Sequence, residues 1–155
     1  MSVLTLTPRG WFSWNFSVLD GERALADVYL SSWRDRGTLT IDSVEYAVSR
    51  EMLLGDFLLQ RSGSVLARAK KPSVFRRSFI IRYEERSYTL QARSAFGRAF
   101  VLLDGRREIG SIVPRNMWTR KAVATFPDDW PLPVKSFAMW LTMVHWRRDA
   151  SAGSG

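Results

Sequence analysis

Apolar and polar residues alternate along most of this chain, and the alternation has the period of β-strands. Trp14, Phe16 and Val18 are separated by polar residues, and the same pattern recurs at short intervals as far as Phe126. Side chains that alternate in this way point to opposite faces of a strand, so that one face is buried. We therefore expect about eleven short strands, at residues 14–18, 24–30, 39–41, 44–48, 57–59, 65–69, 75–83, 88–92, 100–102, 109–113 and 122–126.

Turn-forming residues separate many of these strands. Asp20-Gly21, Asp42-Ser43 and Asp104-Gly105 stand between alternating segments, as do Gly63 and residues 84–87. Asp, Ser and Gly favour the tight turns that join antiparallel strands. Turns that recur about every 8–12 residues are typical of a β-sandwich or a β-barrel.

The pattern changes in the segment LPVKSFAMWLTMVHWRR, at residues 132–148. Apolar side chains between residues 137 and 146 cover every face when they are plotted with the period of a helix. A helix that is apolar all round is buried either in protein or in lipid. Asp128 and Asp129 precede the segment and Arg147 and Arg148 follow it, as the helix dipole favours.

The apolar part of this helix is too short to cross a bilayer, which needs roughly 20 apolar residues. We therefore expect a helix buried in protein and no transmembrane span. A long antiparallel sheet with one apolar face must close on itself or be covered. Wrapping the sheet around the helix buries both apolar surfaces.

The predicted fold is mainly β: a closed, antiparallel-rich β-barrel of about 11–12 strands around a hydrophobic C-terminal helix at about residues 132–148. At 155 residues, the chain is long enough to bury a substantial core. We expect one domain over residues 1–150, followed by a disordered tail at residues 151–155, where the sequence SAGSG is small and polar. The N-terminal sequence has no basic segment followed by a long apolar run, so we expect no signal peptide.

The formal net charge is +8, and it is unevenly distributed. Residues 61–98 hold ten basic and two acidic side chains, whereas residues 1–60 hold five basic and eight acidic ones. A basic block attracts anions such as phospholipid headgroups, nucleic acid or acidic proteins. The alternative interpretation of such a block is a solvated surface with no ligand.

Strand parity places several of these cations on one outward face, because the strands at residues 65–69 and 75–83 can lie side by side. We take six residues as the candidate site for an anionic ligand: Arg68, Lys70, Lys71, Arg76, Arg82 and Arg86. Clustered cations suit phosphate groups, and Arg can form bidentate contacts. Arg77 has the parity of the apolar residues Phe79 and Ile81, so it either points inward to a carboxylate or marks a β-bulge.

The sequence gives no support for an enzyme, a cofactor or a metal site. The chain has no Cys and a single His, and it contains neither a G-x-S-x-G motif nor a glycine-rich phosphate loop. His145 is better explained as a buried, hydrogen-bonded helix residue than as a catalytic one. Asp128 and Asp129 are better explained as features of the helix N-terminus than as a Ca²⁺ site.

The order of these elements resembles the tubby-like superfamily, which includes tubby C-terminal domains, LURP-one-related proteins and phospholipid scramblases. The resemblance covers roughly residues 10–148 and rests on the segments FRRSFII, YTLQARSAFGRAFVLLDG, IGSIVPRN and FAMWLTMVHWRR. It implies a closed barrel around a hydrophobic C-terminal helix, in a compact member of the superfamily. The chain lacks the Cys cluster and the proline-rich arm of scramblases, and no phosphoinositide-binding residue of tubby domains can be matched to it.

We therefore expect a non-enzymatic binding or scaffold module that is cytoplasmic and peripheral to the membrane. The favoured ligand is an anionic phospholipid headgroup, bound through the basic patch. The alternatives are a protein–protein adaptor with an acidic partner and no lipid role, and a barrel that holds a small apolar or acyl ligand. Nucleic acid is disfavoured, because the aromatic residues fall mostly on the inward faces of the strands rather than among exposed cations.

Overall fold

The computed structural model describes residues 1–10, 13–31, 34–52, 55–72, 77–116 and 120–153. In this part of the chain, twelve antiparallel strands close into a barrel and one helix follows them, which confirms the predicted fold class. The strands are β1 (Ser2–Pro8), β2 (Asn15–Asp20), β3 (Arg23–Leu30), β4 (Arg36–Ile41), β5 (Val44–Arg50), β6 (Phe57–Arg61), β7 (Ser64–Lys70), β8 (Ser78–Tyr83), β9 (Arg86–Ala92), β10 (Phe100–Asp104), β11 (Arg107–Pro114) and β12 (Ala122–Phe126).

The barrel closes through β1, a strand that was not among those expected. β1 pairs with β2 on one side and with β12 on the other, where Leu4 lies opposite Ala124. Leu4 and Leu6 are buried, with 3% and 0% of their surface exposed. The alternate residues Thr5 and Thr7 are less buried. Every other strand pairs with its neighbours in sequence, so β1 is the element that leaves the sheet without a free edge.

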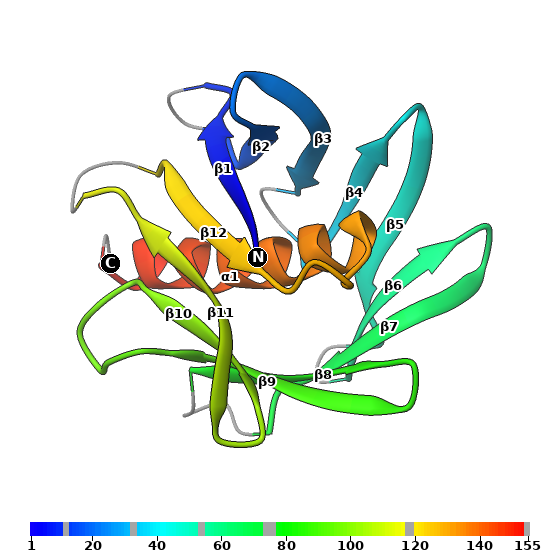
Figure 1. Cartoon of the computed structure of the whole chain (residues 1–155). Coiled ribbons are helices and arrows are strands. Elements are labelled where there is room, and N and C mark those ends of the chain that lie inside the picture. Colours follow the sequence, from blue (N-terminus) through cyan, green and yellow to red (C-terminus); the bar gives the residue numbers. More distant parts are fainter. Residues whose placement is uncertain (11–12, 32–33, 53–54, 73–76, 117–119, 154–155) are drawn as a thin grey trace.

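The helix α1 (Leu132–Gly153) runs through the middle of the ring of strands (Figure 1). Its residues are buried without interruption from Val134 to Trp146, which confirms that the apolar helix is enclosed by protein. The helix ends at Gly153 rather than near Arg148, so residues 151–153 of the expected tail are helical and residues 154–155 lie outside the described residues. No helix in the described part of the chain is long and apolar enough to cross a membrane.

Trp140 is the largest fully buried side chain among the described residues, and it joins the helix to the barrel wall. Its indole Nε1 donates a hydrogen bond to the carbonyl oxygen of Tyr29 at 3.2 Å. Its ring packs edge-on against the ring of Phe57, and the two ring centroids are 5.8 Å apart. Gly37 makes this approach possible, because a Cβ atom there would lie 1.9 Å from the Tyr29 oxygen and 2.6 Å from the indole nitrogen. The absence of a side chain at Gly37 therefore allows β4 to lie close to α1 at this position.

The connections between strands differ sharply at the two ends of the barrel. Consecutive strands are antiparallel neighbours, so connections lie alternately at one end and at the other. One end, which we call the turn mouth, holds the two-residue turns at residues 21–22, 42–43, 62–63, 84–85 and 105–106, and the segment 127–131 that leads into α1. The other end, the loop mouth, holds the C-terminal end of α1 and the described parts of the longer connections at residues 9–14, 31–35, 51–56, 71–77, 93–99 and 115–121.

The contact between Gly37 and Trp140 makes a stability prediction. Gly37→Ala places a methyl group against the Tyr29 carbonyl and the indole, so the strand and the helix must move apart. We expect a loss of about 1–3 kcal/mol in the free energy of unfolding, measured by urea denaturation. Thr40→Ala, at an exposed position of the same strand, is the matched control and should change stability much less. Equal stability of the two variants would contradict the described packing.

Candidate functional site

Three of the sequence-predicted cations lie together on the outer wall of β7 and β8. Arg68 lies opposite Arg82 in the register of these strands, and Lys70 follows on the same face. Arg68 forms ion pairs at 3.3 Å with both Glu51 and Asp56, so its charge is largely balanced. Lys70 and Arg82 are exposed, and neither forms an ion pair with another described residue.

The other predicted cations are separated from this wall. Lys71 lies at the loop mouth, with its amine 5.9 Å from the centroid of the Phe79 ring. Arg86 lies at the turn mouth and forms an ion pair with Asp104 at 2.9 Å. Arg76 lies outside the described residues. The structure therefore brings Arg68, Lys70 and Arg82 together, but it does not gather the described candidates into one surface.

Charge is instead segregated between the two mouths. The described connections of the loop mouth hold three acidic residues (Asp35, Glu51 and Asp56) and nine basic ones: Arg9, Arg34, Lys71, Arg77, Arg93, Arg98, Arg115, Arg120 and Lys121. The connections of the turn mouth hold one basic residue, Arg106, and six acidic ones: Glu22, Asp42, Glu84, Glu85, Asp128 and Asp129. The barrel is thus polarised along its length, with a strongly basic end where the helix terminates.

Arg77 binds one of the basic loops to the helix. Its guanidinium donates to the carbonyl oxygens of residues 94, 95 and 97 in the loop 93–99, at 2.8–3.2 Å. The same group donates to Nε2 of His145 at 2.8 Å and forms an ion pair with Asp149 at 3.1 Å. Arg77 therefore points toward the helix and has a carboxylate partner, the first of the two alternatives that its parity left open.

Asp35 joins two further loops to the helix. Its carboxylate forms ion pairs with Arg147 at 2.7 Å, with Arg50 at 3.3 Å and with Arg148. Arg147 also donates to carbonyl oxygens of the loop 31–35, and Arg50 donates to a carbonyl of the loop 51–56 at 3.0 Å. Three guanidinium groups surround one largely buried carboxylate, so the region keeps an excess of positive charge.

The pKa of Lys71 reflects this excess. Burial lowers the pKa of its amine below the ordinary value, and the neighbouring Arg148 and Arg50 lower it further, against smaller opposing effects of Asp149 and Asp35. Cations that are held close together repel one another, and an anion that binds among them relieves this repulsion. The loop mouth therefore holds an excess of positive charge around Lys71.

His145 lies beneath this region and is buried and hydrogen-bonded, as the sequence predicted. The side chain is 6% exposed, and its Nε2 accepts the hydrogen bond from Arg77. Because Nε2 is an acceptor, the ring is neutral and its proton lies on Nδ1, which has no partner among the described residues. Burial lowers the pKa of His145 to about 4, and the nearby cations Arg77, Lys71 and Arg148 add to this effect against the opposing charge of Asp149.

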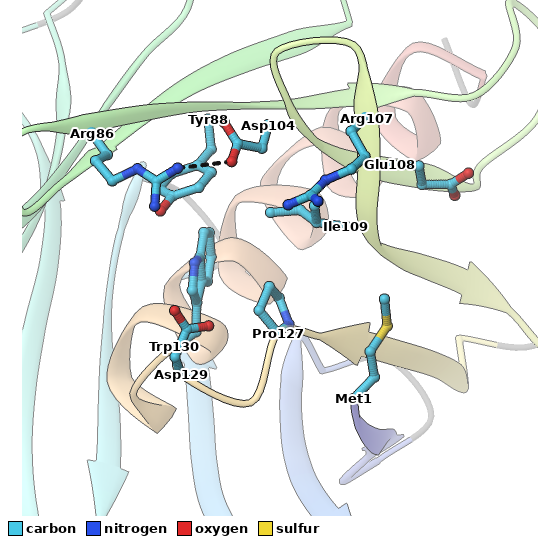
Figure 2. Close-up of a pocket in the computed structure, with 10 residues that line it drawn as sticks. All are labelled: Met1, Arg86, Tyr88, Asp104, Arg107, Glu108, Ile109, Pro127, Asp129 and Trp130. Atoms are coloured by element: carbon cyan, nitrogen blue, oxygen red, sulfur yellow. Dashed lines mark hydrogen bonds and ion pairs between the residues drawn. The ribbon is translucent and has the colours of Figure 1, made fainter.

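A pocket of about 410 Å³ opens at the turn mouth (Figure 2). Trp130 and Tyr88 meet edge to face in its wall, with their centroids 5.0 Å apart. The ion pair of Arg86 and Asp104 crosses one side of it, as Figure 2 shows. Its lining mixes cations and carboxylates without a clear excess of either. The described residues hold no group of three or more His, Asp or Glu that could bind a metal ion.

The sequence did not identify the loop mouth as a candidate site. Its cations, such as Arg34, Arg98 and Arg115, come from segments far apart in the chain and meet only because the barrel closes. One signal was available, since tight turns and longer connections alternate along the sequence. In a closed antiparallel sheet, that alternation sends all the longer connections to one end.

The chain matches no protein-family model, no curated protein and no solved structure. The resemblance to the tubby-like superfamily therefore stays a prediction.

The lowered pKa of His145 predicts how stability depends on pH. The unfolded chain takes up a proton on this residue as the pH falls below about 6.5, whereas the folded chain does so only near 4. The contribution of His145 to stability is therefore present above pH 6.5 and is lost progressively as the pH falls toward 4. Between pH 7.5 and 5, we expect a loss on the order of 1–2 kcal/mol that the His145→Gln variant does not show.

Urea denaturation of both proteins across this pH range measures the difference. Gln is the suitable replacement because its side-chain oxygen can still accept a hydrogen bond from Arg77. Parallel pH profiles of the wild type and the variant would show that His145 is not held neutral in the folded state.

Proposed function

We propose that this chain is a non-enzymatic binding module that docks its loop mouth on membrane surfaces rich in anionic phospholipids, from the cytoplasmic side. The observation that carries the proposal is the segregation of charge between the two mouths. A module whose cations are concentrated in the connections of one end, while the connections of the other end are mainly acidic, is oriented by an anionic surface. The proposal keeps the ligand class that the sequence favoured and moves the contact from the strand wall to the loop mouth.

The strength of such binding follows from the number of cations that reach the surface. A Lys or Arg near an anionic bilayer contributes about 1 kcal/mol, and the contribution falls off within a Debye length. The cation-bearing loops 31–35 and 93–99 are held to the helix by the side chains of Arg147 and Arg77. Their cations are therefore positioned before binding, which reduces the entropy lost on docking.

The two alternatives predict different behaviour. An acidic protein could contact the same basic mouth, and the adaptor hypothesis needs no lipid. An acyl chain or small apolar ligand inside the barrel would have to displace α1, whose buried side chains occupy the interior from Val134 to Trp146. The geometry therefore disfavours the internal-ligand hypothesis. The resemblance to tubby domains, which bind phosphoinositides through basic residues, supports the choice of a headgroup.

Charge reversal at the loop mouth tests the proposal. The triple variant Arg34→Glu, Arg115→Glu and Lys121→Glu changes three exposed residues at this end of the barrel. We expect its affinity for vesicles of phosphatidylcholine and phosphatidylserine to fall at least about a hundredfold in co-sedimentation, since three favourable contacts become repulsive. Wild-type binding should weaken with salt and should be absent with pure phosphatidylcholine vesicles.

The matched control is the triple variant Arg23→Glu, Arg61→Glu and Arg106→Glu, which changes net charge equally at exposed positions of the turn mouth. It should retain most of the wild-type affinity. An equal loss in both variants would mean that net charge alone drives binding, without a defined surface. No binding of the wild type to anionic vesicles at low salt would overturn the lipid proposal in favour of the adaptor.

A further inference from the structure

The two most exposed large apolar side chains in the described part of the chain both lie at the loop mouth. Phe96 is 101% exposed and Met52 is 92% exposed, whereas the next, Met1, is 70% exposed. Isolated apolar residues on a surface are ordinary and need no explanation. Two such residues at the basic end of the barrel, one of them beside Glu51, which is paired with Arg68, form a pattern that a purely electrostatic surface does not require.

The sequence of the connections shows the same contrast. Two of the longer connections, 51–56 and 93–99, present an exposed large apolar side chain, and none of the five two-residue turns contains one. Both ends of the barrel face water in an isolated domain, so solubility gives no reason for this difference. A partner that receives both apolar side chains and cations at one end does give a reason.

The loop that carries Phe96 is held firmly for an exposed segment. Arg77 binds three of its carbonyl oxygens, the backbone N–H of Gly97 donates to the Ser94 hydroxyl at 3.0 Å, and that of Arg93 donates to the Ala99 carbonyl at 2.8 Å. A backbone whose polar groups are already paired can enter a less polar medium at low cost. Phe96 is thus presented outward by a loop suited to the boundary between headgroups and acyl chains.

Met52 is presented in a similar way. The N–H of Glu51 donates to the Asp56 carbonyl at 2.8 Å, and the Arg50 side chain donates to the carbonyl of Gly55 at 3.0 Å. Met52 itself has a left-handed backbone conformation, with φ of 54°, which turns the chain at this position. In two separate connections, therefore, an arginine side chain donates to one or more backbone carbonyl oxygens of the loop that carries the exposed apolar residue.

We propose that Phe96 and Met52 insert into the interfacial layer of an anionic bilayer while the surrounding cations contact its phosphates. The inference rests on the proposed function and adds the mode of contact. Apolar side chains among cations suit a bilayer, which offers negative headgroups at its surface and hydrocarbon a few ångströms below. Nucleic acid and an acidic protein surface supply the charge without that apolar layer.

Truncation of the two side chains tests the contribution of insertion. Phe96→Ala combined with Met52→Ala should weaken binding to anionic vesicles roughly tenfold or more, because two apolar side chains lose a place in the interface. Both residues are fully exposed, so the melting temperature should not change. The control pair Val3→Ala and Val65→Ala removes exposed apolar groups outside the loop mouth and should keep wild-type affinity.

A fluorescent label tests insertion directly. The chain has no Cys, so Phe96→Cys gives a single attachment point for a solvatochromic thiol-reactive dye, and Glu22→Cys at the turn mouth gives the matched control. With phosphatidylcholine–phosphatidylserine vesicles, emission from position 96 should shift to the blue and emission from position 22 should not. Binding by both labelled proteins without a shift at position 96 would overturn insertion and leave electrostatic docking intact. Absence of binding by the unlabelled wild type would overturn the proposed function itself.

Discussion

The enclosure of α1 is the constraint on which the rest of the structure depends. A helix with apolar side chains on every face has no surface that can be left in water, so the sheet must surround it completely. Two-layer packing would leave one side of Trp140 or Phe137 exposed, whereas both are fully buried in the barrel. Closure also removes the free edges of a twelve-stranded sheet, and it depends on the pairing of β1 with β12. The helix and the ring of strands therefore stabilise each other.

This closure has a consequence for function, because it divides all the connections between two ends. The strand order gives one end the tight turns and the segment that leads into α1, and gives the other end the longer loops together with the C-terminal part of the helix. Arg147 and Arg148 would be exposed at a free helix end, but here they bind Asp35 and draw the loop 31–35 against the helix. Arg77 makes the complementary link, because it belongs to a loop and forms an ion pair with Asp149 on the helix. The core is thereby coupled to the surface that we propose as the binding face.

The sequence was sufficient for the architecture, because alternation, turn residues and an all-apolar helix are local signals. It was not sufficient for β1, where Leu4 and Leu6 give only a short alternation before Pro8, and the strand is specified by pairing with distant residues such as Ala124. The candidate site was harder for the same reason. The excess of basic residues at positions 61–98 predicted a binding site for an anion in that segment. In the structure, however, Arg68 and Arg86 from that segment are paired with carboxylates. The cations that gather at the loop mouth come from the whole length of the chain, and only closure of the barrel brings them together.

The orientation of α1 on a membrane tests the central claim most directly, because the helix runs from the turn mouth to the loop mouth. Polarised infrared spectroscopy of the protein bound to a supported phosphatidylcholine–phosphatidylserine bilayer reports the angle between the helix axis and the membrane normal. If the loop mouth is the docking face, the dichroism of the helical amide band should place α1 closer to the normal than to the plane of the bilayer. A helix that lies in the plane would contradict the account, since it would mean that the protein binds through the side of the barrel instead of through the loop mouth.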